Sequence, residues 1–259
     1  MGVRGLLRYC TPIQKKQGSC QDLRIGVDGF SLMFLFREDR TRFEEYLQSL
    51  LKQLPKSITF VMDKRASKEK KVLEERKGLR TKAKEEADSI LSFLKSTEVE
   101  DSQRSILEKL IVQRERAAWH TYPEYIQWLS SLLHRLNILM VWAKEEADTM
   151  LAEDDYDIVI SSDSDMLILG VKRLWIPKHS TEITHEDFIQ FIGIDEDLLF
   201  ELAYLAGCDV QPKSHMSIQA AVSNIKFYGS LNNIYKRRPE IVTKEMLEEC
   251  ISLKQILSI

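Results

Sequence analysis

The sequence predicts an α/β protein with a central, mostly parallel sheet flanked by helices. Short, unalternated runs rich in Ile and Val recur along the chain, and such runs are typical of strands buried on both faces. Stretches of helical periodicity separate them, and this alternation is typical of a doubly wound parallel sheet. After the last apolar run only helical patterns remain, so we expect a helical C-terminal region.

The expected elements follow one another in a regular order. Strands are predicted from Arg24, Ser57, Ile138, Asp157 and Arg173. Helices are predicted near Phe30, over Arg42–Leu54, Ser105–Ala118 and Tyr122–Leu136, after Lys144, and from Thr184 onward. Between Ser89 and Glu108 the chain is polar, and we expect a mobile segment around STEVEDSQRS.

Composition limits the class of protein. The hydrophobic content of 44% is that of a soluble globular protein, and no apolar stretch approaches the roughly 20 residues of a membrane span. The N-terminus lacks the apolar core of a secretory signal. The four cysteines show no C-x-x-C pair, so free thiols in an intracellular, reducing compartment are expected for Cys10, Cys20, Cys208 and Cys250.

The charge is unevenly distributed. The net charge of −3 excludes a generally basic nucleic-acid coat, but the segment from Lys64 to Lys84 carries ten basic residues against three glutamates. A solvated helix face with i,i+4 ion pairs is one interpretation. A local excess of this size favours phosphate binding instead.

Carboxylates recur at the ends of the predicted strands or at the starts of the following helices. They are Asp28, Asp63, Glu146, Asp148, Asp163, Asp165 and Asp209. Taken singly, Asp28 or Asp63 is as well explained as a helix cap. Because parallel strands share a carboxyl edge, however, all seven can gather in one cleft, where they would stay ionised only around cations. Oxygen ligands without a His or Cys cluster predict two divalent ions, Mg²⁺ or Mn²⁺, about 4 Å apart and clamping a phosphodiester.

Six segments in this order and spacing carry a family resemblance: MGVRGLLRY, VDGFSLMF, VMDKRASKEKK, EEADTMLA, VISSDSDMLILG and LAGCDV. They resemble the XPG/flap endonuclease family of structure-specific 5′-nucleases, closest to its exonuclease-1-like branch. The resemblance implies a PIN-like 5′-nuclease fold with a nuclease domain over residues 1–210. It also implies a helical arch over about 64–108 and a reduced helical C-terminal region over 211–259.

The resemblance assigns roles to individual residues. The seven carboxylates match the family's metal ligands, which implies two Mg²⁺ ions for which Mn²⁺ can substitute. Lys70 matches the arch lysine that contacts the scissile phosphate. Arg76 matches the arch arginine if one residue is deleted here; otherwise Lys77 takes that place. Both Lys70 and Arg76 would polarise the phosphate, so no side-chain nucleophile is required.

Further residues are expected to contact nucleic acid. Gly2 matches the small N-terminal residue beside the active site, and Phe34 matches an aromatic residue that stacks on the nucleotide, although Phe34 could equally belong to the core. Lys71, Lys77 and Arg80 extend the basic arch. The tryptophans are expected in the core rather than on a base-stacking surface: Trp119, Trp128, Trp142 and Trp175.

Two features depart from the family pattern or complicate it. The tetrapeptide EEAD occurs twice, and we interpret Glu85–Asp88 as arch surface and Glu145–Asp148 as part of the site. No glycine lies between Val210 and Tyr228, where the family has a Gly-rich helix–turn–helix that holds duplex DNA. That contact is therefore in doubt, and simpler ends, single strands or RNA become candidate substrates. Divergent members of this kind occur in large DNA viruses.

These observations predict a Mg²⁺-dependent nuclease that cleaves DNA at flaps, nicks or 5′ ends and leaves 5′-phosphate products. Its expected setting is DNA replication, repair or recombination, in the nucleus or at a cytoplasmic replication site. Nucleic acid is the expected partner, with no membrane and no evident sliding-clamp peptide. The alternatives are an RNA endonuclease of the host-shutoff type and a non-catalytic, nuclease-like scaffold.

Overall fold

The sheet is the centre of the structure, a computed structural model that describes residues 2–16, 23–37, 39–53, 57–64, 71–120, 122–144, 146–208 and 215–256. Of residues 71–76 and 255–256 only the backbone is described. The strands are β1 (Lys15–Lys16), β2 (Arg24–Asp28), β3 (Ser57–Met62), β4 (Leu139–Trp142), β5 (Ile158–Ile160), β6 (Arg173–Ile176) and β7 (Thr181–Thr184).

The strand order is β1-β7-β6-β5-β2-β3-β4, and β2 to β6 run parallel to one another. This confirms the predicted α/β class and the mostly parallel sheet. The sequence analysis missed β7 and β1, which add two antiparallel strands at one edge. It was wrong to expect only helices after β6. Strand β7 reads TEIT, a short and half-polar segment, and it forms because a tight turn with Ser180 at φ 50° folds it back onto β6.

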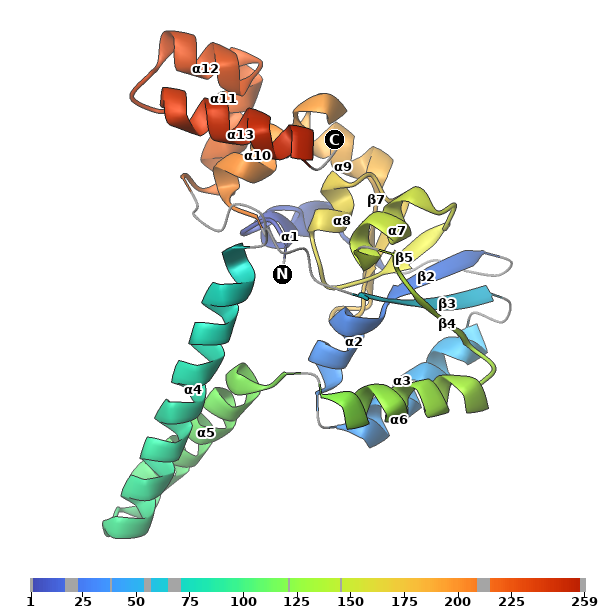
Figure 1. Cartoon of the computed structure of the whole chain (residues 1–259), viewed down its shortest axis with the longest axis vertical. Helices are drawn as coiled ribbons and strands as arrows, with labels where there is room; N and C mark the ends of the chain where they lie inside the picture. Colours follow the sequence, from blue (N-terminus) through green and yellow to red (C-terminus); the bar gives the residue numbers. More distant parts are fainter. Residues whose placement is uncertain are drawn as a thin grey trace.

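Helices cover both faces of the sheet (Figure 1). They are α1 (Leu6–Tyr9), α2 (Gly29–Phe36), α3 (Arg40–Gln53), α4 (Lys71–Ser96), α5 (Asp101–Ala118), α6 (Pro123–Arg135), α7 (Ala147–Glu153), α8 (Asp165–Ile168), α9 (His185–Ile192), α10 (Leu199–Ala206), α11 (Ile218–Tyr228), α12 (Leu231–Arg237) and α13 (Lys244–Ile256). Two 3₁₀ turns lie at Thr11–Ile13 and Glu196–Leu198.

Two hydrophobic clusters lie on opposite faces of the sheet. Alternate side chains of β2 and β3, such as Val27 and Phe60, pack against α2, α3 and α6 on one face. Val61 and Val159 point to the other face, towards α1 and α7 to α13. Strands β3, β5 and β6 therefore have buried apolar residues on both sides, which explains their unalternated apolar runs in the sequence.

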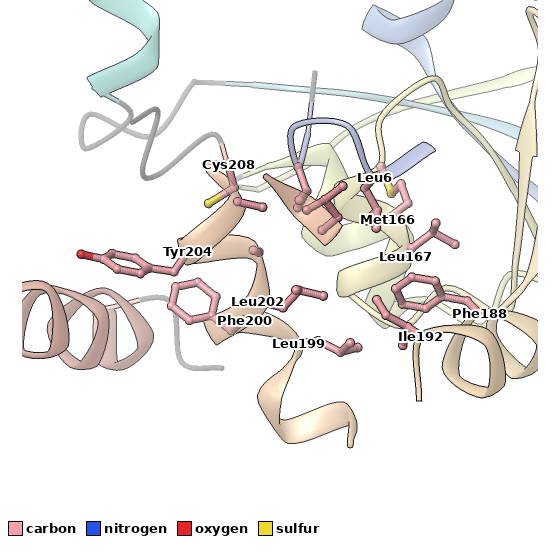
Figure 2. Packing of buried hydrophobic residues seen from close by; sticks show 14 of the residues in the cluster. Leu6, Met166, Leu167, Phe188, Ile192, Leu199, Phe200, Leu202, Tyr204 and Cys208 are labelled. Carbon is pink, nitrogen blue, oxygen red and sulfur yellow. The ribbon is translucent and has the colours of Figure 1, made fainter. Parts of the chain in front are cut away.

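Helix α10 joins the C-terminal helices to the rest of the molecule. Seven of its eight residues are buried, and Figure 2 shows Leu199, Leu202 and their neighbours beside side chains of α1, α8 and α9. The same cluster continues into α11, α12 and α13 through Val222, Ile234 and Cys250. The predicted domain boundary at residue 210 falls in the segment 209–214, outside the described residues.

Helices α4 and α5 project from the body as a long hairpin (Figure 1). Ala83 and Ala87 of α4 are buried in this hairpin, as is Ile111 of α5, and Arg114 Nε lies 2.8 Å from Glu86 Oε2. The sequence analysis expected a polar, mobile segment around STEVEDSQRS, from Ser96 to Ser105. Helix α4 reaches Ser96 and α5 begins at Asp101, so only a short turn separates them, because packing of one helix on the other outweighs the polar local sequence.

Some side chains differ from the expected burial. Trp119 and Trp175 are buried as predicted, but Trp142 is 44% exposed and Leu139 is 60% exposed. Both lie on β4, an edge strand of the sheet, where fewer neighbours cover the side chains. The three described cysteines, Cys10, Cys208 and Cys250, are free thiols. No described helix is both long enough and apolar enough to cross a membrane.

Candidate metal centre and nucleic-acid interface

The acidic residues meet at the point where the strand order reverses. From β2 the chain moves outward through β3 to β4 and then returns to β5 on the other side of β2. Asp28 ends β2, Asp63 follows β3, and Asp163 follows β5 by three residues. These three aspartates therefore occupy adjacent strand ends at the switch point, the usual ligand position of open α/β sheets.

Asp28 is held in a fixed orientation. It is the N-cap of α2, where its Oδ1 accepts a hydrogen bond from the backbone N–H of Ser31 at 2.9 Å. Its Oδ2 accepts a hydrogen bond from Ser161 Oγ at 2.8 Å. The side chain is only 7% exposed, so these hydroxyl and amide groups replace the water that the carboxylate has lost.

The segment after β5 forms a tight turn around the second carboxylate. The N–H of Asp163 donates to Ser161 Oγ at 2.9 Å, and the N–H of Asp165 donates to Asp163 Oδ1 at 3.0 Å. Ser31 Oγ accepts from the N–H of Ser162 at 2.8 Å and ties this turn to α2. The DSD sequence thus begins α8 and also presents Asp163 beside Asp28.

The charges of these aspartates act on one another. Burial raises the pKa of Asp28 from an ordinary value of 3.8 to about 6, although the bonds from Ser31 and Ser161 oppose the rise. The negative charges of Asp163 and Asp63 raise that pKa further. Three carboxylates that repel one another at a sheet edge form a site that a cation would stabilise.

Asp63 links the site to the next pair of acids. Its Oδ1 accepts a hydrogen bond from the backbone N–H of Ala147 at 2.6 Å, at the start of α7. Glu146 is the N-cap of that helix, and Asp148 lies in its first turn. The structure therefore places Glu146 and Asp148 of the second EEAD segment at the same edge of the sheet as Asp63.

Gly2 packs directly against the site. A Cβ on Gly2 would lie 2.1 Å from Asp163 Oδ1 and 2.4 Å from Ser164 Oγ, and its φ of +57° also favours glycine. Ser164 Oγ donates to the carbonyl of Val3 at 3.1 Å, and the N–H of Arg4 donates to the carbonyl of Gly207. The N-terminal segment is thereby fixed between the DSD turn and the end of α10.

The donor set fits hard divalent cations, since it consists of carboxylate oxygens without thiol or imidazole ligands. The side chains of the described residues do not form a ready-made cage of three or more ligands. Asp209, the seventh predicted ligand, lies outside the described residues.

The arch residues are only partly described. Lys70 lies outside the described residues, and the side chains of Lys71 and Arg76 on α4 are not described. Lys77 is exposed on α4. The first EEAD segment, Glu85–Asp88, also lies on α4, as the sequence analysis expected for the arch surface.

Phe34 of α2 lies at the base of the arch. The guanidinium of Arg80 lies 5.4 Å from the centre of its ring, and Trp119, just after α5, contacts it edge-on at 5.0 Å. Phe34 thus contacts Arg80 of α4 and Trp119, the C-cap of α5. Its role as a stacking residue for a nucleotide stays a prediction.

Sequence reasoning missed the serines of the site. Ser161 is fully buried and bonds to both Asp28 and the N–H of Asp163, while Ser31 bonds to both Asp28 and Ser162. Each follows shortly after the apolar run of a predicted strand. A serine just after a predicted strand and close to a strand-ending acid was the sequence signal that could have identified both residues.

Neither a protein-family model nor a curated protein matches the sequence. Solved structures do match. The catalytic core of Rad2 in complex with DNA substrate is 19% identical, with a TM-score of 0.63 over 98% of this chain and 78% of the Rad2 chain. The chain has the fold of the Rad2 catalytic core. A second Rad2 complex with DNA substrate gives a TM-score of 0.61 at 20% identity, over 98% of this chain and 80% of the Rad2 chain.

Human GEN1 in complex with Holliday junction DNA shares the Rad2-like fold. It is 16% identical, with a TM-score of 0.59, and the match covers 98% of this chain and 62% of the GEN1 chain. At these identities the likeness to Rad2 and GEN1 is one of fold. It confirms the predicted PIN-like 5′-nuclease architecture.

Proposed function

We propose that this protein is a metal-dependent nuclease that hydrolyses phosphodiester bonds of DNA at or near 5′ ends, such as flaps and nicks. The observation that carries the proposal is the meeting of Asp28, Asp63 and Asp163 at the switch point of a Rad2-like sheet. The Rad2 and GEN1 structures were determined with DNA, which supports DNA as the substrate here.

The carboxylates at the switch point would hold two Mg²⁺ ions, for which Mn²⁺ can substitute. Bound divalent ions polarise a phosphodiester and stabilise the charge that develops during its hydrolysis. Glu146, Asp148, Asp165 and Asp209 would complete the ligand set.

The remaining residues orient the ligands and the substrate. Ser31 and Ser161 fix the rotamer of Asp28, and the absence of a side chain on Gly2 leaves room for Asp163. Lys70 and Arg76 would neutralise the phosphate from the arch. Lys71, Lys77 and Arg80 would extend that basic surface along the strand.

The test is a cleavage assay with Mg²⁺ and three labelled substrates: 5′-flap DNA, nicked duplex DNA and single-stranded RNA. Wild-type protein should cut the flap or the nick and leave 5′-phosphate ends. Asp163→Asn should reduce the rate by at least about a thousandfold, since the charge of a metal ligand is lost while its size is kept.

The substrate panel also separates the alternatives. If only the RNA were cleaved, the metal-dependent mechanism would stand, but the substrate would be RNA and not DNA. DNA binding by wild-type protein without cleavage in Mg²⁺ or Mn²⁺ would contradict the enzymatic proposal and favour a nuclease-like scaffold.

A further inference from the structure

A cationic groove lies between the base of the arch and the end of α2. Its volume is about 660 Å³, and it is lined by Arg37 on one side and by α5 on the other. The α5 residues that line it are 105, 108, 109, 112, 113, 116 and 117, which recur every three or four positions. They therefore form a single stripe of the helix, separate from Ile111 and Arg114, which pack or pair within the hairpin.

The groove has an excess of positive charge. Arg37, Lys109 and Arg116 line it against one acid, Glu108. Among the residues that the structure describes, these three cations form no ion pair. Ser105 and Gln113 add polar groups to the same wall. Such a set suits an anion, because each cation still has N–H donors to offer.

The conformation and the burial of Arg37 are both energetically unfavourable. Its backbone lies at φ 51° and ψ −120°, a region that glycine adopts far more readily. Its buried Nε has no hydrogen-bond partner within the described part of the chain. Burial lowers the pKa of its guanidinium, and the nearby charge of Arg116 lowers it further. A strained, partly buried arginine that faces another arginine is unfavourable unless an anion joins them.

The position of the groove relates it to the candidate metal centre. Asp28 is the N-cap of α2 and Arg37 is its C-cap, so the helix connects the two sites. Nine residues at a rise of 1.5 Å place them about 14 Å apart along the helix axis. A strand of a few nucleotides spans that distance.

We propose that the groove of Arg37, Lys109 and Arg116 binds a backbone phosphate of the nucleic-acid strand that extends from the metal centre. This inference rests on the proposed function and adds a second contact point for the same substrate. The preferred substrates then carry a 5′ single-stranded arm long enough to reach the groove. A free phosphate or a mononucleotide has the same chemistry but lacks the link to the metal centre.

Binding is measured without cleavage, in EDTA, by fluorescence anisotropy with labelled nicked duplexes that carry 5′ arms of increasing length. Affinity for wild-type protein should rise once the arm is a few nucleotides long. In the double variant Arg37→Gln/Arg116→Gln, affinity for long arms should fall about tenfold, and the log–log slope of affinity against salt should decrease by about 1. Because no cleavage is involved, this outcome is independent of the test of the nuclease proposal.

Arg104→Gln is the matched control, since Arg104 lies exposed on the same helix but outside the groove. It should bind all arms as wild-type protein does. Equal losses for Arg104→Gln and the double variant would contradict a specific site. Free competitors give a further check. If inorganic phosphate, a mononucleotide or polyglutamate displaced the labelled substrate at the same concentration as an unlabelled long-armed duplex does, the proposal would be contradicted.

A second variant separates binding from folding. Arg37→Gly relieves the backbone strain, so it should raise the midpoint of thermal unfolding by about 1 to 4 °C while it weakens binding of long arms. A structural role for Arg37 predicts the reverse, a lower midpoint with binding intact.

Discussion

At the scale of single residues, Gly2 has no room for a side chain. Gly2→Ala places a methyl group 2.1 Å from Asp163 Oδ1, so the carboxylate must move. We predict that this substitution reduces cleavage at least a hundredfold and leaves the sheet folded. Steady-state cleavage and circular dichroism measure the two effects.

Gly5→Ala is the control for this prediction. Gly5 also has a left-handed φ, +75°, but a Cβ there meets only Ile218 at an ordinary 3.5 Å. It should lower the midpoint of thermal unfolding through backbone strain and leave cleavage nearly unchanged. If both variants lost activity equally, strain at the N-terminus rather than contact with Asp163 would be responsible.

Asp28 makes the metal-free protein sensitive to pH. Its pKa of about 6 in the folded protein lies above the ordinary 3.8, so the folded state favours the protonated carboxyl. The contribution of this group to stability therefore declines as the pH rises from about 4 to about 6 and stays low above that. Asp28→Asn removes the dependence.

We predict that in EDTA Asp28→Asn matches the thermal midpoint of wild-type protein near pH 4 and exceeds it by several degrees above pH 6. At pH 7.5 Mg²⁺ should raise the wild-type midpoint more than that of the variant. A difference between the two proteins that is constant from pH 4 to pH 8 would argue against burial of an ionised Asp28.

At the scale of elements, the arch is a helical hairpin held by few contacts to the body. Ala87 is buried between α4 and α5, whereas its neighbour Asp88 is exposed. We predict that Ala87→Lys exposes the amides of the hairpin to hydrogen exchange and leaves those of β2 and β5 protected. In Asp88→Lys, the amides of the hairpin and of the sheet should be as protected from exchange as in wild-type protein. Loss of protection in the sheet of the Ala87 variant would show that arch and sheet unfold as one unit.

The elements differ in how far the sequence predicts them. The parallel strands were predictable because burial leaves apolar runs, and helix α5 from Ser105 to Ala118 was predictable from its periodicity. Strand β7 and the helical turns over Ser89–Ser96 were not, because their local sequence is polar. Pairing with β6 and β1 stabilises β7, and packing of α4 on α5 stabilises the helical turns. The carboxylates were predicted as a set, but the bonds of Ser31 and Ser161 depend on the side-by-side position of β2 and β5. The groove of Arg37 and Arg116 joins residues far apart in sequence within charge-rich segments, and nothing local marks it.

At the scale of the whole molecule, the topology explains the division of roles. The sheet brings acids from several separate segments to one edge, while the arch and the end of α2 supply positive charge beside that edge. The acidic residues at the strand ends and the basic residues of the arch thus lie on different elements. This separation suits hydrolysis of a polyanion by a protein whose net charge is −3.

The repeated tetrapeptide EEAD offers the most direct test of this account. Asp148 lies at the switch-point edge and Asp88 lies exposed on the arch, so Asp148→Asn and Asp88→Asn make the same change in the same local sequence. The measurement is the Mg²⁺ dependence of 5′-flap cleavage by the two variants. We predict that Asp148→Asn lowers the rate at least a hundredfold or raises the required Mg²⁺ concentration tenfold, while Asp88→Asn behaves as wild-type protein. Equal activity of the two variants would contradict a metal centre at this edge of the sheet.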